Sequence, residues 1–306
     1  MEKQNIYPWQ LPKNTRQIEE EINQGKIRRL FDGVFKFIFC KEERVPIFLD
    51  LLSAIVFPGG ERVFTQAHFI DREISPERHG GKSAHLDVLA VMDNGDTVNI
   101  EVQVHIDSVF LKRVVAYTSW LHGGQLNKGK KYHEVKRTIS VNILGYELFK
   151  GDERFRRVFS LREDESGELL NDDIRLIFLD VPKFVRNVQA PKTKLERWMA
   201  YLAGTGGEAM EQIAEQEPMI SDALVAERFF MMDWEKRLAY MQWWKHVLDE
   251  ETRKAYDEER EARIRESDAR IKEFEANAEE SDAHIRELEA RIREREARIR
   301  ELEARG

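Results

Sequence analysis

The chain has 306 residues, of which 35% are charged, and its formal net charge is -8. This length has room for one large domain, or for one domain and an appendage. The acidic balance argues against a polycation that binds nucleic acid over its whole surface, but it permits a local basic patch. Cys40 is the only cysteine, which excludes an intrachain disulfide and is typical of a reducing, cytoplasmic compartment.

The sequence predicts no association with membranes. Residues 1–5 lack the apolar core of a signal peptide. The most apolar run, residues 47–57, is too short to cross a bilayer and contains Asp50, so we expect a buried helix there.

Residues 1–27 are polar, and we expect them to form a peripheral segment with one short helix. Apolar residues at helical spacing then predict two further helices, and Pro58-Gly59-Gly60 ends the second of these. The expected elements are helices at 15–24, 31–40 and 45–56, a strand at 63–71 and a loop at 75–83.

Residues 86–104 contain two strands of alternating apolar residues joined by a tight turn. Asp87 lies inside the first strand, and Glu101 and Gln103 lie two residues apart in the second, so they share one face. Carboxylates that face the buried side of a sheet need partners, and a divalent metal ion is a common one. The hairpin therefore predicts a metal site.

The turn decides whether the two carboxylates meet. A two-residue turn at Asn94-Gly95 would place Asp87 and Glu101 on opposite faces of the hairpin. A three-residue loop, residues 93–95 with Gly95 in the left-handed conformation, would place them opposite each other on one face. We predict the three-residue loop, because only a turn of this parity brings the carboxylates together.

Beyond the hairpin, Asp107-Ser108 is predicted to cap a helix that Gly123-Gly124 ends. Further strands follow, and the chain then becomes helical with tryptophans as core anchors. The expected elements are a helix at 107–121, strands at 138–144, 155–161 and 174–179, and helices across 192–249 with Trp198, Trp234, Trp243 and Trp244 in the core.

From residue 250 the chain is a heptad array, which predicts a coiled coil. Arginines precede the first core position of most heptads and acidic residues follow the second, which favours parallel pairing of identical chains. The alternative is a lone helix held by Glu–Arg pairs four residues apart. The first core positions are Ile264, Ile271, Ala278, Ile285, Ile292 and Ile299, and the second are Ser267, Phe274, Ser281, Leu288, Arg295 and Leu302.

The acidic pair on the hairpin suits hydrolysis of a phosphodiester. This reaction needs a cation that offsets the charge of the scissile phosphate and lowers the pKa of an attacking water. Mg²⁺ or Mn²⁺ fits, since Mg²⁺ binds through one or two carboxylates and keeps several waters. Gln103 is able to orient a water but not to exchange a proton near neutral pH.

These residues resemble a known family. Asp87 followed by Glu101-Val102-Gln103 is similar to the PD-(D/E)XK nuclease motif in its E-x-Q form. The wider pattern resembles the Rpn-type recombination-promoting nucleases, also called transposases, over about residues 28–249. It consists of FDGVFKFIF at 31–39, NIEVQ at 99–103, Arg113, Tyr117, QLNKG at 125–129 and Tyr132.

The resemblance implies an α/β fold with a restriction-endonuclease-like mixed β-sheet core flanked by helices and continued by a helical C-terminal part. It also implies metal-dependent DNA cleavage, with Asp87 and Glu101 as metal ligands and Asp32 completing the acidic cluster. Gln103 stands where the superfamily has a catalytic lysine. Lys36 and Arg113 are the candidates to replace that lysine.

Each supporting residue has a structural alternative. Asp32 is equally suited to cap the helix that follows it. Lys36 and Arg113 are of a type that more often serves as a surface cation or a carboxylate partner than in catalysis. His85 and His105 flank the acidic pair, but no Cys/His spacing supports a zinc site.

The main basic cluster follows the helix after the hairpin. Its side chains, together with Arg113, are expected to bind DNA phosphates without regard to sequence, and the alternative is a solvated loop. The cluster comprises Lys128, Lys130, Lys131, Lys136 and Arg137.

We therefore expect a cytoplasmic, Mg²⁺-dependent DNA endonuclease of the recombination-promoting type that forms a homodimer or higher homo-oligomer through residues 264–302. The expected parts are a peripheral segment at 1–27, a nuclease-like domain at 28–249 and a coiled-coil tail at 250–306. The alternative is a catalytically inactive nuclease-fold module that binds DNA or protein and assembles through the coiled coil. A third interpretation treats the heptads as an assembly scaffold.

Overall fold

The computed structural model describes residue 12 and residues 14–70, 73–74, 84–85, 88–104, 108–126 and 131–303, without side chains at 73–74, 84–85, 251, 276, 278–283, 285 and 296–303. The chain divides into two units, Met1–Trp244 and Lys245–Gly306. No helix in the described part is both long and apolar enough to cross a membrane.

The first three predicted helices are present. Asn14 caps the first of them, since its Oδ1 accepts a hydrogen bond from the Gln17 N–H at 3.0 Å. Pro46 lies in the first turn of the third, where a missing N–H costs nothing. These elements are α1 (Thr15–Asn23), α2 (Asp32–Phe39), the short 3-10 helix η1 (Glu42–Arg44) and α3 (Val45–Val56).

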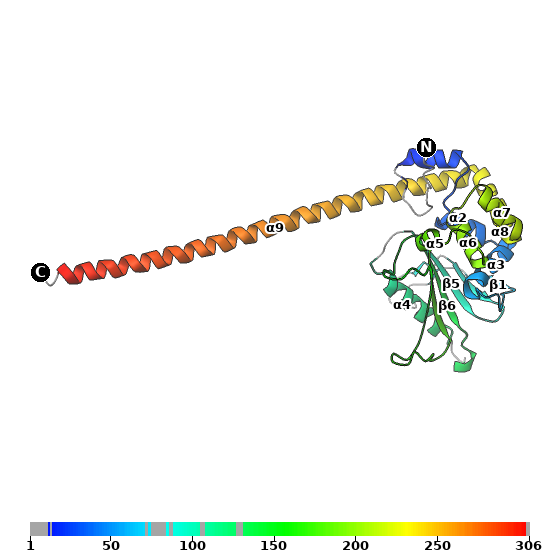
Figure 1. Ribbon diagram of the computed structural model, residues 1–306, viewed down its shortest axis with the longest axis horizontal. Helices are drawn as coiled ribbons and strands as arrows, with labels where there is room; N and C mark the ends of the chain where they lie inside the picture. Colours follow the sequence, from blue (N-terminus) through cyan, green and yellow to red (C-terminus); the bar gives the residue numbers. More distant parts are fainter. Residues whose placement is uncertain are drawn as a thin grey trace. The chain divides into compact units, whose positions relative to one another are not determined.

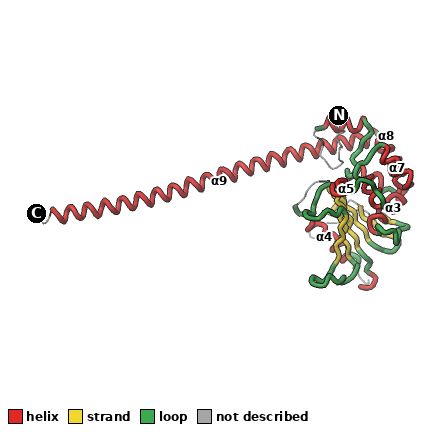
Figure 2. Tube along the Cα trace, viewed as in Figure 1, coloured by secondary structure: helices red, strands yellow, loops and turns green. Residues whose placement is uncertain are grey.

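A mixed six-stranded sheet forms the centre of the first unit, with the strand order β1-β4-β5-β6-β8-β7 (Figures 1 and 2). β6 pairs in parallel with β5 and β8, and the other pairs are antiparallel. A separate two-stranded sheet joins β2 and β3. The strands are β1 (Ala67–Phe69), β2 (Glu73–Ile74), β3 (Ala84–His85), β4 (Val88–Met92), β5 (Thr97–Gln103), β6 (Thr138–Leu144), β7 (Arg156–Ser160) and β8 (Ile174–Asp180).

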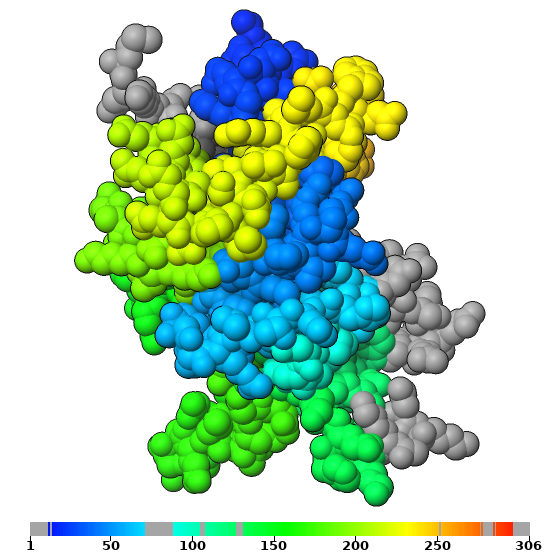
Figure 3. Space-filling model, turned by 90° about the vertical axis from the view of Figure 1, so that its right-hand side faces the viewer, coloured from blue at the N-terminus to red at the C-terminus, as the bar shows by residue number. Residues whose placement is uncertain are grey.

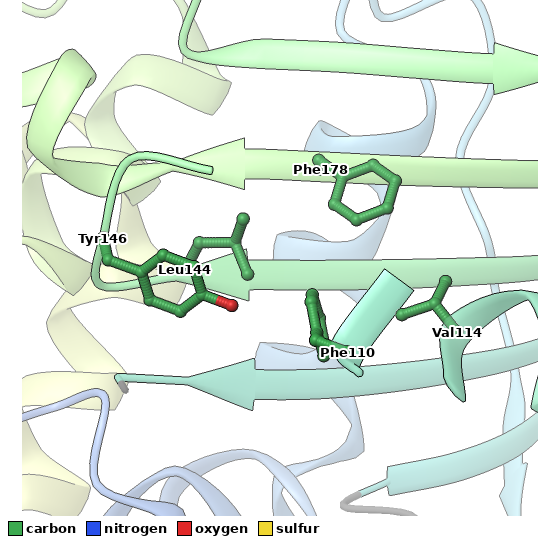
Figure 4. Packing of buried hydrophobic residues seen from close by; sticks show 5 residues of the cluster. All are labelled: Phe110, Val114, Leu144, Tyr146 and Phe178. Atoms are coloured by element: carbon green, nitrogen blue, oxygen red, sulfur yellow. The ribbon is translucent and has the colours of Figure 1, made fainter. Parts of the chain in front are cut away.

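Helices cover both faces of this sheet, which confirms the expected α/β class. On one face, Phe110 and Val114 of α4 pack with Leu144 and Phe178 of the sheet (Figure 4). On the other face, the rings of Phe48 in α3 and Phe69 in β1 lie 5.0 Å apart. The remaining helices are α4 (Phe110–Gly123), η3 (Tyr132–Glu134), α5 (Val181–Asn187), α6 (Lys194–Leu202), α7 (Glu208–Gln216), α8 (Pro218–Met232) and α9 (Trp234–Glu303).

The N-terminal helix packs against the start of α9, as Figure 3 shows for the dark blue and yellow segments. Arg28 forms a buried ion pair with Glu21 of α1 at 2.8 Å, and its guanidinium lies 5.0 Å from the ring centre of Trp244. Trp198 and Trp244 are buried as predicted, whereas Trp234 is 64% exposed, so its predicted place in the core is wrong.

The second unit continues α9, so the prediction of a helix there is confirmed. The core-position side chains that the structure describes are exposed in the single chain, with Ile264 at 51% and Ile271 at 52%. Arg270 pairs with Glu266 one turn earlier at 2.8 Å, as in a solvated helix. Pairing with a second chain stays a prediction.

Candidate active site

The hairpin between β4 and β5 has the predicted three-residue loop. Val91 pairs with Thr97, and the Met92 N–H donates to the Asp96 carbonyl at 2.9 Å. Gly95 has a φ of 85°, the left-handed conformation that this loop requires. Asp87 lies outside the described residues, so its position opposite Glu101 stays a prediction.

Glu101 is the acidic residue at the centre of the site. It lies on β5, between β4 and β6, and is only 5% exposed. Its Oε1 accepts hydrogen bonds from Gln103 Nε2 at 3.2 Å and from Arg113 Nη2 at 3.0 Å. A buried carboxylate needs such charge-assisted partners, because desolvation otherwise disfavours its ionised form.

Arg113 reaches Glu101 because α4 crosses this face of the sheet. Its guanidinium lies 5.4 Å from the ring centre of Phe110, whose side chain is fully buried between α4 and the sheet. The Arg113 side chain is part exposed, whereas the Glu101 side chain is buried. The structure thus brings together three predicted site residues, Glu101, Gln103 and Arg113, and it makes Arg113 a carboxylate partner.

Asn99 and Asn142 are buried polar residues on the sheet face of Glu101 to which the sequence analysis gave no role. Asn142 of β6 pairs in register with Glu101, and Asn99 of β5 pairs with Ser140. The side-chain nitrogen of Asn142 donates to Ser140 Oγ at 3.1 Å and to the Ile177 carbonyl at 3.2 Å. The available signal was polar residues at every second position of two otherwise apolar strands, Thr97-x-Asn99-x-Glu101-x-Gln103 and Thr138-x-Ser140-x-Asn142.

Asp32 and Lys36 form a second pair of predicted residues. Lys36 Nζ lies 2.6 Å from the Asp32 carboxylate, one turn apart on α2. The N-cap of this helix is Phe31, and no side chain caps it. The alternative role of Asp32 as the helix cap is therefore wrong, because its carboxylate turns to Lys36 instead.

The basic cluster divides into free and paired cations. Arg137 binds Asp96 at 3.1 Å and Asp172 at 2.6 Å, so two carboxylates hold its guanidinium. Lys131 and Lys136 are exposed, and within the described part of the chain no carboxylate lies within ion-pair distance of either. Lys128 and Lys130 lie outside the described residues.

Gln125, part of the family-like QLNKG motif, has a structural role. Its amide nitrogen donates to the Lys136 carbonyl at 2.9 Å and to Thr138 Oγ1 at 3.1 Å, and its oxygen accepts from the Lys136 N–H at 2.9 Å. These bonds fix the chain after α4 to the start of β6. They hold the Lys136 backbone next to the sheet and leave its charged side chain exposed.

The donor chemistry at Glu101 suits a hard cation. The Glu101 carboxylate offers oxygen ligands, which suit Mg²⁺ or Mn²⁺ rather than soft metals. Among the side chains that the structure describes, no three His, Cys, Asp or Glu residues gather closely enough to hold an ion. A complete metal site at Glu101 therefore requires Asp87 or further ligands.

Comparison with known proteins gives one match. The family model of the PD-(D/E)XK nuclease family transposases matches residues 29–257. No curated protein and no solved structure matches the chain. The matched range contains the whole six-stranded sheet and every residue of the candidate site.

Proposed function

Because the chain belongs to the PD-(D/E)XK nuclease family transposases, we propose that it is a DNA endonuclease that depends on Mg²⁺ or Mn²⁺. The observation that carries this proposal is Glu101, a buried carboxylate on a central strand with Arg113 and Gln103 bound to it. A merely structural glutamate gains little from burial, because desolvation offsets much of its ion-pair energy. A carboxylate kept there suits a role in binding a cation.

Glu101 and Asp87 are the proposed metal ligands, and Asp32 is the proposed third acidic group. The bound cation would offset charge on the scissile phosphate and lower the pKa of the attacking water. Gln103 and Arg113 hold the Glu101 carboxylate in place through their hydrogen bonds. Arg113 and Lys36, both part exposed, are the candidates for the cation that faces the phosphate.

DNA is the proposed partner of the exposed lysines. Lys131 and Lys136 carry unpaired charges within the described part of the chain, and Lys128 and Lys130 belong to the same segment. Lysines of this kind bind phosphates and give a salt-dependent affinity without sequence preference. Arg137 is the weakest member of the predicted set, because Asp96 and Asp172 already hold it.

The proposed oligomer forms through the tail, with identical chains parallel and in register. Core side chains such as Ile264 and Ile271 are about half exposed in the single chain and gain apolar burial on pairing. Parallel pairing places each g-position residue opposite an acidic e position five residues later, such as Arg270 with Glu275 or Arg291 with Glu296. Antiparallel pairing would oppose arginine to arginine.

Charge reversal in the full chain tests this pairing. Arg270→Glu with Arg291→Glu is expected to weaken the oligomer in sedimentation experiments, because glutamates then face glutamates. Adding Glu275→Arg and Glu296→Arg restores the charge pattern and is expected to restore assembly. A monomeric wild type, or equal assembly of all three proteins, would contradict the proposal.

Plasmid cleavage tests the proposed activity. We expect the wild type to cut DNA with Mg²⁺ or Mn²⁺ and to be inactive with a chelator. Asp87→Ala and Glu101→Ala are expected to reduce the rate at least about 100-fold. Arg154→Ala, a change at an exposed residue of the loop before β7, is the matched control and is expected to leave the rate unchanged.

The second candidate function is an inactive nuclease-fold module that binds DNA or protein. The presence of Gln103 in place of a proton-exchanging lysine favours it. DNA binding without cleavage at any metal concentration, equal for the wild type and both alanine variants, would support this alternative and refute the endonuclease.

A further inference from the structure

The face of the sheet under α4 carries a ladder of polar side chains that the metal ligands do not account for. Asn99 is 3% exposed and Asn142 is fully buried, and the two flank Glu101 on the same face. Asn99 lies opposite Leu89 of β4, and Asn142 lies opposite Phe178 of β8. A buried amide in such surroundings destabilises the fold when its hydrogen bonds are unmade.

The side-chain oxygens of both asparagines lack donors. In the described part of the chain, no hydrogen-bond donor contacts Asn99 Oδ1 or Asn142 Oδ1, and both atoms are inaccessible to solvent. The structure also fixes which way Asn142 points. Its nitrogen donates to the carbonyls of Ser140 and Ile177 and to the Ser140 hydroxyl. Turning the amide round would place its oxygen against the two carbonyl oxygens, which cannot donate, so the observed orientation is favoured.

No described residue supplies the missing donors, and a bound water is suited to supply them. Native proteins satisfy buried polar atoms of this kind with ordered water, which needs polar partners on more than one side. The two amide oxygens and the Glu101 carboxylate provide three acceptors on neighbouring positions of β5 and β6. A water that donates to them is held next to the carboxylate.

We infer that Asn99 and Asn142 are positioning residues that accept hydrogen bonds from water bound to the cation at Glu101. The inference rests on the proposed function, since it needs a metal at Glu101. Mg²⁺ and Mn²⁺ in protein sites keep part of their water shell, and those waters are strong donors. The two amides therefore raise cation affinity without binding the cation themselves, because they hydrogen-bond to water molecules that do.

Calorimetric titration of the full-length protein with MnCl₂ tests the inference. Asn99→Leu and Asn142→Leu keep the side-chain size but remove the oxygens, and each is expected to weaken Mn²⁺ binding about 10-fold or more. Asn99→Asp keeps an oxygen acceptor and is expected to bind at least as tightly as the wild type. Thr97→Val, on the same face of β5 but farther along the strand from Glu101, is the matched control and is expected to bind like the wild type.

The outcomes separate the two proposals. Wild-type affinity in both leucine variants would overturn the inference and leave the metal site standing, with the asparagines holding structural water only. Equal weakening in Asn99→Leu and Asn99→Asp would overturn it too, because packing rather than an acceptor would then matter. If Asn142→Leu does not fold, the comparison of the wild type with Asn99→Leu and Asn99→Asp still tests the inference. A wild type that binds no Mn²⁺ would remove the proposed metal centre itself.

Discussion

The two faces of the central sheet are both buried but differ in chemistry. Toward α3, strands β5 and β6 present only aliphatic side chains, namely Val98, Ile100, Val102, Ile139, Val141 and Ile143. Toward α4, the same strands present mainly polar side chains, which are threonine, serine, asparagine, Glu101 and Gln103, with Leu144 as the one aliphatic residue. The aliphatic face needs no partners and stabilises the fold by burial alone. The polar face depends on specific hydrogen bonds, which is the arrangement expected where a ligand completes the structure.

A charge placed on the aliphatic face should cause the largest loss of stability. Ile100→Asp would bury a carboxylate with no partner and is expected to cost about 4 kcal/mol or more, enough to unfold a marginally stable domain. Urea denaturation measures the loss. Ala116→Asp, at an exposed position of α4, is the control and should cost less than about 1 kcal/mol. Similar losses in both variants would contradict the division.

The pH dependence of stability tests the burial of Asp180, which lies on the polar face. Burial raises the pKa of this carboxyl to about 6, and the N–H and charge of Lys183 oppose the rise only in part. Since an unfolded aspartate ionises near pH 4, the folded protein holds the proton more tightly between about pH 4 and pH 6, and stability from this group is lost as the pH rises through that range.

Asp180→Asn cannot ionise and should not show this loss. Its stability relative to the wild type is expected to increase by about 2 kcal/mol between pH 4 and pH 8. The amide oxygen still accepts from the Lys183 N–H that Asp180 now binds at 3.0 Å, so the cap of α5 is kept. Parallel pH curves for the two proteins, from urea denaturation at each pH, would contradict the explanation.

Removing the Arg113 guanidinium, the charge partner of Glu101, should have the next largest effect on stability. Arg113→Ala leaves a buried carboxylate with a lost charge partner and is expected to cost about 2 kcal/mol, less than a fully buried pair because Arg113 is part exposed. Arg113→Lys retains the charge and should cost less. Denaturation at low and high salt measures both. An unchanged Arg113→Ala protein would show that Glu101 does not need this partner.

The hairpin loop should give the smallest effect. Gly95→Ala forces an alanine to a φ of 85° and is expected to cost about 1 kcal/mol. Gly123→Ala, at the end of α4 where an added Cβ meets nothing within 4 Å, is the control and should be neutral or stabilising. A Gly95→Ala protein as stable as the wild type would mean that the loop does not fix the register.

Local signals in the sequence predicted the elements well. The apolar run at 138–144 identified β6 with its exact bounds, and the parity argument for the two carboxylates identified the loop that sets the register of β4 with β5. The heptads predicted the helix at the C-terminus but not its partner, because an isolated chain and a paired one share the same pattern.

The site itself was only partly predictable, since its contacts join residues far apart in the sequence. Glu101 and Gln103 share a strand face by local geometry alone. Arg113 meets Glu101 only because α4 packs on that face, and Asn142 lies beside Glu101 only through the parallel register of β5 and β6. Arg137 was predicted to bind DNA, but its partner Asp172 is supplied by the loop before β8.

Glu101 is proposed to hold a divalent cation on the polar face of the sheet. Electron paramagnetic resonance of Mn²⁺, titrated into the full-length protein and into Glu101→Gln, tests it most directly, because glutamine keeps the shape but removes the charge. We expect the wild type to bind Mn²⁺ and the variant to bind it at least about 10-fold more weakly while remaining folded. Equal binding by both proteins, or no binding by either, would contradict the claim.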